Sequence, residues 1–151
     1  MKVLWIVLGV LFGLCLLCAG GGYFVFNKAK GILTDATQSG DNSFRAIATG
    51  WDEKVFKEQA TPGFAGQTGE SGIAALAQKY KASFGPVKGA FTSHIVGINA
   101  RNNNGVSQTQ ATWTADVTFE KGSGSVTMDL VNMNEKWLVS SLSIRSTGPS
   151  H

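Results

Sequence analysis

Four ionisable side chains lie in stretches of the sequence where apolar and polar residues alternate. They are His94, Asp116, Glu120 and Asp129. Such a side chain acts as a general acid or base when burial or a charged neighbour tunes its pKa. The three carboxylates alternate against the apolar positions, so the pattern predicts that they face solvent. His94 shares its parity with Val96 and Ile98. Phe91 and Ile95 have the opposite parity, so the direction of the His94 side chain stays open.

Motifs for other chemistry are absent from the sequence. It contains no Ser-His-Asp order, no HExxH and no glycine-rich phosphate loop. Both cysteines, Cys15 and Cys18, lie in an apolar N-terminal stretch, so the remainder has no cysteine for a disulfide or a zinc site. The sequence therefore predicts no cofactor and no metal, and it leaves His94 as the one catalytic candidate.

The N-terminal stretch is typical of a membrane helix. Residues 3–26 contain no charge, and as a helix they would be about 36 Å long, enough to cross a hydrocarbon core of about 30 Å. We expect residues 1–27 to form an uncut signal anchor. Two alternatives stay open. One is cleavage at the small residues Cys18-Ala19-Gly20, and the other is lipid attachment to Cys15 or Cys18, although leucine precedes both.

The same stretch carries a helix-pairing pattern. Gly9 and Gly13 have the GxxxG spacing, and Gly20 falls on about the same side of a helix. Small residues allow two membrane helices to approach closely, so a homodimer through the membrane helix is possible. Glycine is also common in membrane helices that do not pair, and this alternative stays open.

The distribution of basic residues argues against nucleic acid as a partner. Of the 13 Lys plus Arg, three flank the apolar stretch (Lys2, Lys28 and Lys30), so the remaining ten balance the 10 Asp plus Glu. Those ten are scattered, whereas nucleic-acid binders concentrate them on one face. We expect no nucleic acid, but a membrane and an unknown protein partner. Because little precedes the anchor, the C-terminal domain is expected on the periplasmic or extracytoplasmic side of the cell inner membrane.

Residues 28–41 are expected to form a juxtamembrane linker, and a loose helical extension is the alternative that stays open. Two amphipathic helices are predicted after it. The first begins at Asp41 or Ser43, since either side chain is able to cap a helix. Its apolar face follows helical spacing through Phe44, Ile47, Ala48, Trp51 and Val55. Gly50 and Asp52 predict a kink within it.

The second helix is bounded by clear breaking signals. Thr61-Pro62-Gly63 ends the first helix, and Phe64–Glu70 is expected to be a loop. The second helix begins near Ser71. Gly85 is placed as its C-terminal cap, and Pro86 prevents continuation.

From Val87 the apolar period changes from 3.6 to 2, which is typical of strands. Four strands are predicted, at about 90–100, 106–120, 126–130 and 137–146, joined by turns at "RNNNG", "KGSG" and "NMNEK". In the second strand the inward residues are Ala111, Trp113, Ala115, Val117 and Phe119. In the fourth strand the apolar parity changes after Val139, which predicts a bulge near Ser140-Ser141.

Helices followed by a strand meander predict an α+β fold. We expect an N-terminal transmembrane helix, then two helices packed on a curved four-stranded antiparallel sheet over residues 42–147, and a disordered tail over 148–151. The stretches "WDEKVFKEQATPGF", "LAQKYKASFGPVK", "ATWTADVTFEKGSGSVTMDL" and "EKWLVSSLSI" carry this order. From Asn42 to Ser146 the pattern resembles the nuclear transport factor 2-like superfamily, which has a cystatin-like, cone-shaped fold.

The resemblance implies two classes of function. Enzymes of this superfamily place an Asp or His inside the apolar cone, and membrane-anchored members are common in bacteria. The neutral domain and the outward carboxylates favour a non-catalytic, envelope-facing module for binding or assembly. The alternative is a small-ligand-binding protein or a cone-pocket enzyme that uses His94.

Overall fold

The computed structural model describes Ile6 and residues 30–149. The chain divides into two compact units, Met1–Asp35 and Ala36–His151. In the first unit, residues 30–35 are helical. The second unit contains all four strands and forms the α+β domain.

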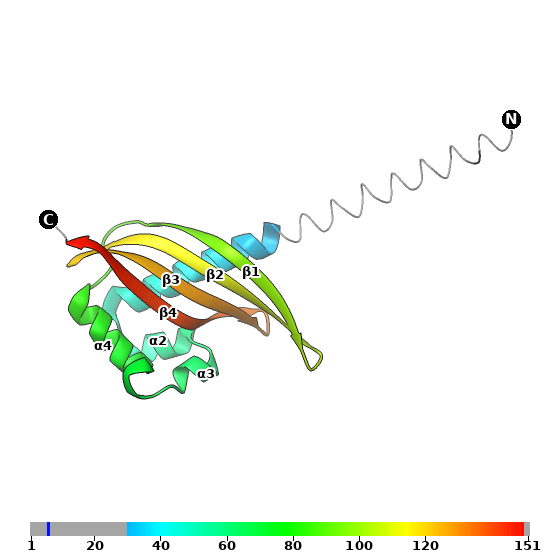
Figure 1. Ribbon diagram of the computed structural model, residues 1–151, viewed down its shortest axis with the longest axis horizontal. Coiled ribbons are helices and arrows are strands. Elements are labelled where there is room, and N and C mark those ends of the chain that lie inside the picture. The colour runs from blue at the N-terminus through cyan, green and yellow to red at the C-terminus, as the bar shows by residue number, and fades with distance from the viewer. Residues whose placement is uncertain (1–5, 7–29, 150–151) are drawn as a thin grey trace. The chain divides into compact units, whose positions relative to one another are not determined.

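The helices of the domain precede its strands, as the sequence predicts. Residues 36–50, named here the leading helix, are followed by α2 (Glu53–Gln59), α3 (Pro62–Ala65), the 3-10 turn η1 (Gly69–Ser71) and α4 (Ile73–Ser83). The strands are β1 (Thr92–Asn103), β2 (Val106–Phe119), β3 (Gly122–Met133) and β4 (Lys136–Pro149). Figure 1 shows the helices on one face of a curved sheet. The prediction of helices packed on a four-stranded antiparallel sheet is confirmed.

The leading helix begins before its predicted start. Residues 36–40 are already helical, so the expectation of a cap at Asp41 or Ser43 is wrong, and the linker expected over residues 28–41 is helical from residue 30. Ala36 is fully buried, and a Cβ on Gly40 would lie 2.4 Å from the Trp113 ring. These small residues therefore continue the buried face of the helix toward its N-terminus.

The predicted kink after Gly50 is confirmed. The leading helix ends there, Trp51 adopts a φ of 49°, and α2 begins two residues later. The Asp52 carboxylate caps α2 by accepting from the N–H groups of Lys54 and Val55. The buried Trp51 donates its indole N–H to the Gly85 carbonyl at 2.7 Å, and this bond ties the turn to the end of α4.

The loop predicted over Phe64–Glu70 contains short helical segments. Pro62 occupies the first turn of α3, and the Thr61 hydroxyl accepts from the Phe64 N–H at 3.3 Å. Proline favours the first helical turn, which explains why a breaking signal starts a helix here. The second predicted helix corresponds to α4, and Gly85 follows its end with a φ of 71°.

The sheet is a meander with the strand order β1-β2-β3-β4. The β1–β2 turn is Asn104-Gly105, with φ values of 54° and 80°, as "RNNNG" predicts. The β3–β4 turn is Asn134-Glu135, with φ values of 52° and 64°. A left-handed backbone is ordinary for glycine and asparagine but is strained for glutamate.

The described strands have three register shifts, of which one leaves Thr147 near the end of β4 as an extra residue. The other two are bulges in the middle of β4 and β1 that set which side chains face the helices. Asp129 pairs with Ser141 and Leu130 with Val139, so Ser140 is the extra residue that the sequence predicts. A second bulge was not predicted. Ile95 pairs with Trp113 and Gly97 with Thr112, which leaves Val96 as the extra residue of β1.

The core lies between the helices and the inner face of the sheet. The predicted inward residues of β2 are all buried, and so are Val126, Met128 and Leu130 on β3. Trp113 is fully buried, with its ring 5.4 Å from that of Phe44 and 5.9 Å from that of Phe91. The register that the sequence predicts for β2 and β3 is confirmed.

Apart from Ile6, the predicted membrane segment lies outside the described residues, and the same holds for Gly9, Gly13, Gly20 and both cysteines. Of the helices in the part of the chain that the structure describes, none is long and apolar enough to span a bilayer.

Replacing Trp113 by alanine is expected to lower the free energy of unfolding by about 3 to 5 kcal/mol, because a large aromatic side chain leaves a cavity in the core. The matched control is Thr114→Ala, since Thr114 faces the opposite side and is expected to cost far less. Urea denaturation of the two variants measures the difference. Equal losses would show that the register of β2 is wrong.

Replacing Glu135 by glycine is expected to raise the free energy of unfolding by about 1 kcal/mol, because glycine adopts a φ of 64° without strain. The control is Glu120→Gly in the β2–β3 turn, where φ is not positive. Glu120→Gly relieves no backbone strain in the folded state and raises the conformational entropy of the unfolded chain, so it is expected to lower the free energy of unfolding. Stabilisation by both changes, or by neither, would contradict the strain argument.

Candidate functional site

His94 lies on the outer face of the sheet, opposite the helices. It pairs with Thr114, its side chain is exposed, and its Nε2 lies 3.1 Å from the Thr114 Oγ1. Ile98, which shares its sequence parity, pairs instead with the buried Ala111. The bulge at Val96 separates the two residues onto different faces. The ambiguity in the sequence pattern thus has a physical cause, and His94 does not point into the interior.

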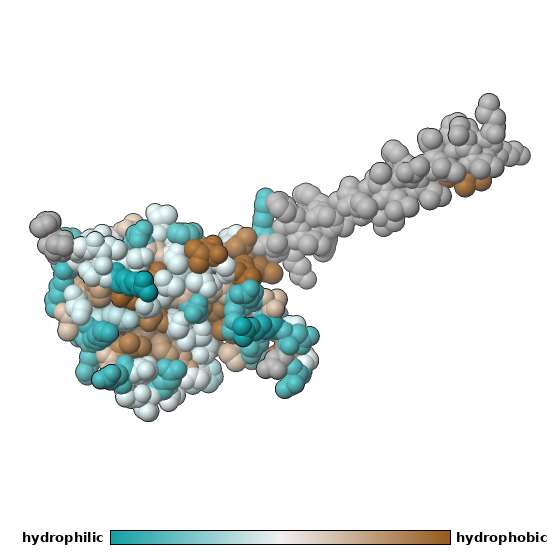
Figure 2. All heavy atoms as spheres, in the orientation of Figure 1, coloured by the Kyte–Doolittle hydropathy of each residue, from teal (hydrophilic) through white to brown (hydrophobic). Residues whose placement is uncertain are grey.

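The three strand carboxylates are exposed, as predicted. Asp129 binds hydroxyl groups of both neighbouring strands, with Thr112 Oγ1 donating to Oδ1 at 2.9 Å and Ser141 Oγ donating to Oδ2 at 2.8 Å. These contacts cross-link β2, β3 and β4 on the outer face. In Figure 2, pale and teal atoms predominate over the sheet, with some brown among them. The outer face is therefore mainly polar and rich in hydroxyl groups.

A carboxylate that the sequence pattern did not single out as a site meets the sheet from the leading helix. Asp41 Oδ1 accepts the indole N–H of Trp113 at 2.9 Å and also the hydroxyl of Ser93. Asp41 is half-buried, and Ser93 faces the helices because it pairs with the buried Ala115. If the predicted helix had begun before Ala36, its helical spacing would have placed Asp41 on the side that faces the sheet.

The Asp41 cluster has the contacts of a structural anchor. The Trp113 indole N–H and the Ser93 hydroxyl both donate to the same carboxylate oxygen of Asp41. His94 follows Ser93 in the sequence but lies on the opposite face of the sheet, so it does not reach this cluster. Beside the cluster, the guanidinium of Arg45 lies 5.0 Å from the centre of the Phe91 ring. These contacts join the leading helix to β1 and β2, and they supply no acid–base pair.

Aromatic side chains fill the interior between the helices and the sheet. Phe44 touches Trp113, Phe91, Trp51 and Phe119, with ring centroids 5.4 to 6.5 Å apart. Every described buried side-chain nitrogen or oxygen has a hydrogen-bond partner. The described residues of this region therefore form a packed core.

The side chain of Tyr80 is buried where α4 packs on β4. Burial raises the pKa of its hydroxyl above the ordinary value. The hydroxyl donates to the Leu142 carbonyl at 3.4 Å, and the Tyr80 ring packs against those of Trp51 and Phe84. The neutral Tyr80 hydroxyl therefore helps to hold α4 against β4.

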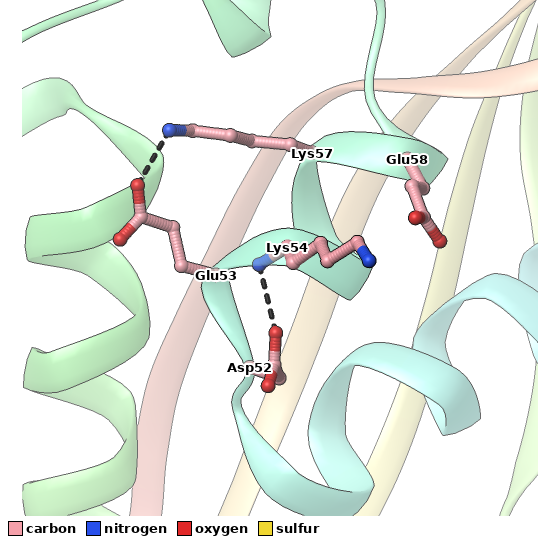
Figure 3. Close-up of a pocket in the computed structure, with 5 residues that line it drawn as sticks. All are labelled: Asp52, Glu53, Lys54, Lys57 and Glu58. Carbon is pink, nitrogen blue, oxygen red and sulfur yellow. Dashed lines mark hydrogen bonds and ion pairs between the residues drawn. The ribbon is translucent and has the colours of Figure 1, made fainter.

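A hollow with a volume of about 640 Å³ lies on the surface of α2. It is lined by Asp52, Glu53, Lys54, Lys57 and Glu58. Figure 3 shows the Glu53–Lys57 ion pair on the side of α2 that faces α4, while Lys54 and Glu58 extend the other way. Within residues 30–149 no group of three His, Cys, Asp or Glu side chains is arranged to hold a metal ion. This hollow has the character of a solvated helix surface.

Comparisons with known proteins give a likeness in structure but no family. No protein-family model matches the chain, and no curated protein matches it. Among solved structures, it is similar to a variant of a protein designated Rd1NTF2_05, with 13% sequence identity and a TM-score of 0.39. The match covers 79% of this chain and 97% of that chain. No functional residue is carried over from this likeness.

Replacing Asp41 by alanine is expected to lower the free energy of unfolding by about 1 to 3 kcal/mol, because the Trp113 and Ser93 donors lose their acceptor. Asp41→Asn should cost less, since an amide oxygen still accepts a hydrogen bond. Asp116→Ala is the control, because Asp116 is an exposed carboxylate and its loss is expected within about 0.5 kcal/mol. Thermal denaturation compares the three, and equal effects at positions 41 and 116 would refute the anchor.

Proposed function

We propose that the chain is a membrane-anchored, non-catalytic module for protein binding or assembly, with an α+β domain of the nuclear transport factor 2-like, cystatin-like cone type. The observation that carries the proposal is the filled interior. Trp113, Phe119 and Met128 are all at most 1% exposed, and they occupy the space where enzymes of the cone type hold their ligands. A domain with such an interior acts through its surface.

The position of His94 supports the same proposal. A pocket enzyme would need this side chain inside the cone, beside a group that orients it. His94 is exposed on the outer face, and its one described side-chain partner is a threonine hydroxyl. These observations weigh against the alternative of a pocket enzyme or a small-ligand carrier that uses His94.

The anchor and the location belong to the proposal as well. Residues 3–26 form the uncharged span, with the domain on the periplasmic or extracytoplasmic side of the inner membrane and Gly9, Gly13 and Gly20 on a helix-pairing face. A domain without net positive charge lacks the excess of basic side chains that would neutralise the phosphates of a nucleic acid, so we propose no nucleic-acid partner. Tethering raises the local concentration of such a module near a partner in the same membrane.

Complementation of a deletion strain tests the module. His94→Ala is expected to restore the phenotype fully, because His94 takes no part in the proposed contacts. A variant in which a cleavable signal peptide replaces residues 1–27 is expected to fail, since the released domain loses its tether. Immunoblots check the amounts of both, and intact-mass measurement of the membrane-extracted wild type checks that residues 3–26 remain. Loss of function with His94→Ala, together with full function of the released domain, would favour the enzyme.

A further inference from the structure

The two edges of the sheet differ in their backbone partners. At the β4 edge, the Thr61 N–H donates to the Val139 carbonyl at 2.8 Å, and Ala60 forms a parallel bridge with Val139. At the other edge, the described backbone partners of β1 all lie on β2. Within residues 30–149, no second strand covers the outer side of β1. Its peptide groups are a template for another strand.

The exposed aliphatic side chains of the domain gather on the same hairpin. In residues 36–149 the exposed large hydrophobic side chains are Val96, Ile98 and Val106, at 58%, 37% and 60% exposure. Val96 and Ile98 flank Gly97 in the middle of β1, and Val106 begins β2. An edge strand usually carries charges or proline against unwanted pairing. In β1 the one charged residue is Arg101, and there is no proline.

We propose that β1 pairs in antiparallel orientation with β1 of a second copy, about a two-fold axis near Gly97. The two four-stranded sheets then form one continuous eight-stranded sheet. This proposal deepens the proposed function, because it names a second copy of the chain as the partner of one surface of the module.

Three features of β1 favour its own copy as the occupant. The apolar middle of the strand meets itself across a two-fold axis near Gly97. The two Arg101 side chains then lie at opposite ends, about 27 Å apart at 3.4 Å per residue, so like charges do not meet. The bulge at Val96 increases the local twist, and a symmetry-related β1 has the same twist. An unrelated peptide would not in general share the apolar middle, the charge placement and the twist of β1.

Site-specific disulfide cross-linking of the full chain tests the pairing. In a background with Cys15 and Cys18 changed to serine, single cysteines replace Gly97 or Ile98, and the chain is oxidised in detergent micelles. A side chain at Gly97 would meet no atom within 4 Å, so the substitution fits the fold. The control is Thr127→Cys, on an exposed position of the central strand β3. We expect covalent dimers from position 97, where the two copies face each other across the axis. Only background is expected at 127 and at 98, because Ile98 faces Val96 of the second copy and the two Cα atoms of residue 98 lie about 8 Å apart, too far for a disulfide.

A lysine introduced on the β1 edge tests whether the pairing of the two copies can be disrupted. Val96→Lys is expected to reduce cross-linking at position 97 about tenfold, since each lysine then faces the apolar Ile98 of the second copy and a like charge lies on either side of the axis. Val106→Lys alters a side chain of similar exposure away from the β1 edge and should leave cross-linking unchanged. Circular dichroism verifies that both variants fold. Cross-linking equal to that at position 127, or equal effects of the two lysines, would overturn the proposal.

Two further outcomes separate this proposal from the proposed function. If the β1 cysteines link to a different protein in native membranes and not to a second copy, the self-pairing is wrong while the binding module stands. If the released domain restores the phenotype but β1 still cross-links to itself, the tethered module is wrong while the pairing stands. Dimers held by the membrane helix alone would give no excess at position 97, and would also overturn the pairing.

Discussion

The indole of Trp113 joins the leading helix to the sheet through contacts of three kinds. Its ring packs against Phe44 and Phe91, its N–H donates to Asp41, and its edge lies where any side chain on Gly40 would collide with it. The apolar contacts are non-directional, whereas the hydrogen bond and the close approach each fix a position along the helix. Together they determine which turn of the helix meets which residue of β2.

This way of filling the interior constrains what the domain is able to do. An apolar cone becomes a ligand site when it is left hollow and an ionisable group enters it. Here the polar group that reaches the sheet from the helix, Asp41, is held by Trp113 and Ser93. The interior therefore supplies stability and a fixed shape, which supports the proposal that the domain binds a partner through its surface.

The sequence predicts the parts of the fold in which many residues obey one period. In β2 and β3 the alternation runs without interruption, so the inward residues, including Trp113, follow from pattern alone. In β1 the bulge at Val96 shifts the parity by one residue in mid-strand, and a bulge beside glycine leaves no signature in the apolar pattern. That single insertion is the reason that the direction of His94 stayed open.

The start of the leading helix and the Asp41 cluster were missed for a related reason. Aspartate before an apolar run is a usual helix cap, and the alanine and glycine before it have little hydrophobic signal. Their burial follows from the size of Trp113, which lies more than seventy positions later in the chain. A local pattern does not contain such a contact, although the helical spacing of Ala36, Gly40 and Phe44 is consistent with it once the partner is known.

The charge distribution limits the kind of recognition that remains. The three basic residues in excess over the acidic ones flank the apolar stretch, and the rest of the chain is neutral. The Glu53–Lys57 ion pair lies on an exposed helix surface, where such a pair contributes little. For the proposed binding module, long-range attraction therefore has little part in bringing a partner to the domain. Its specificity would come from short-range contacts, through apolar side chains and backbone groups of a sheet edge, and the proposed pairing of β1 uses both kinds together.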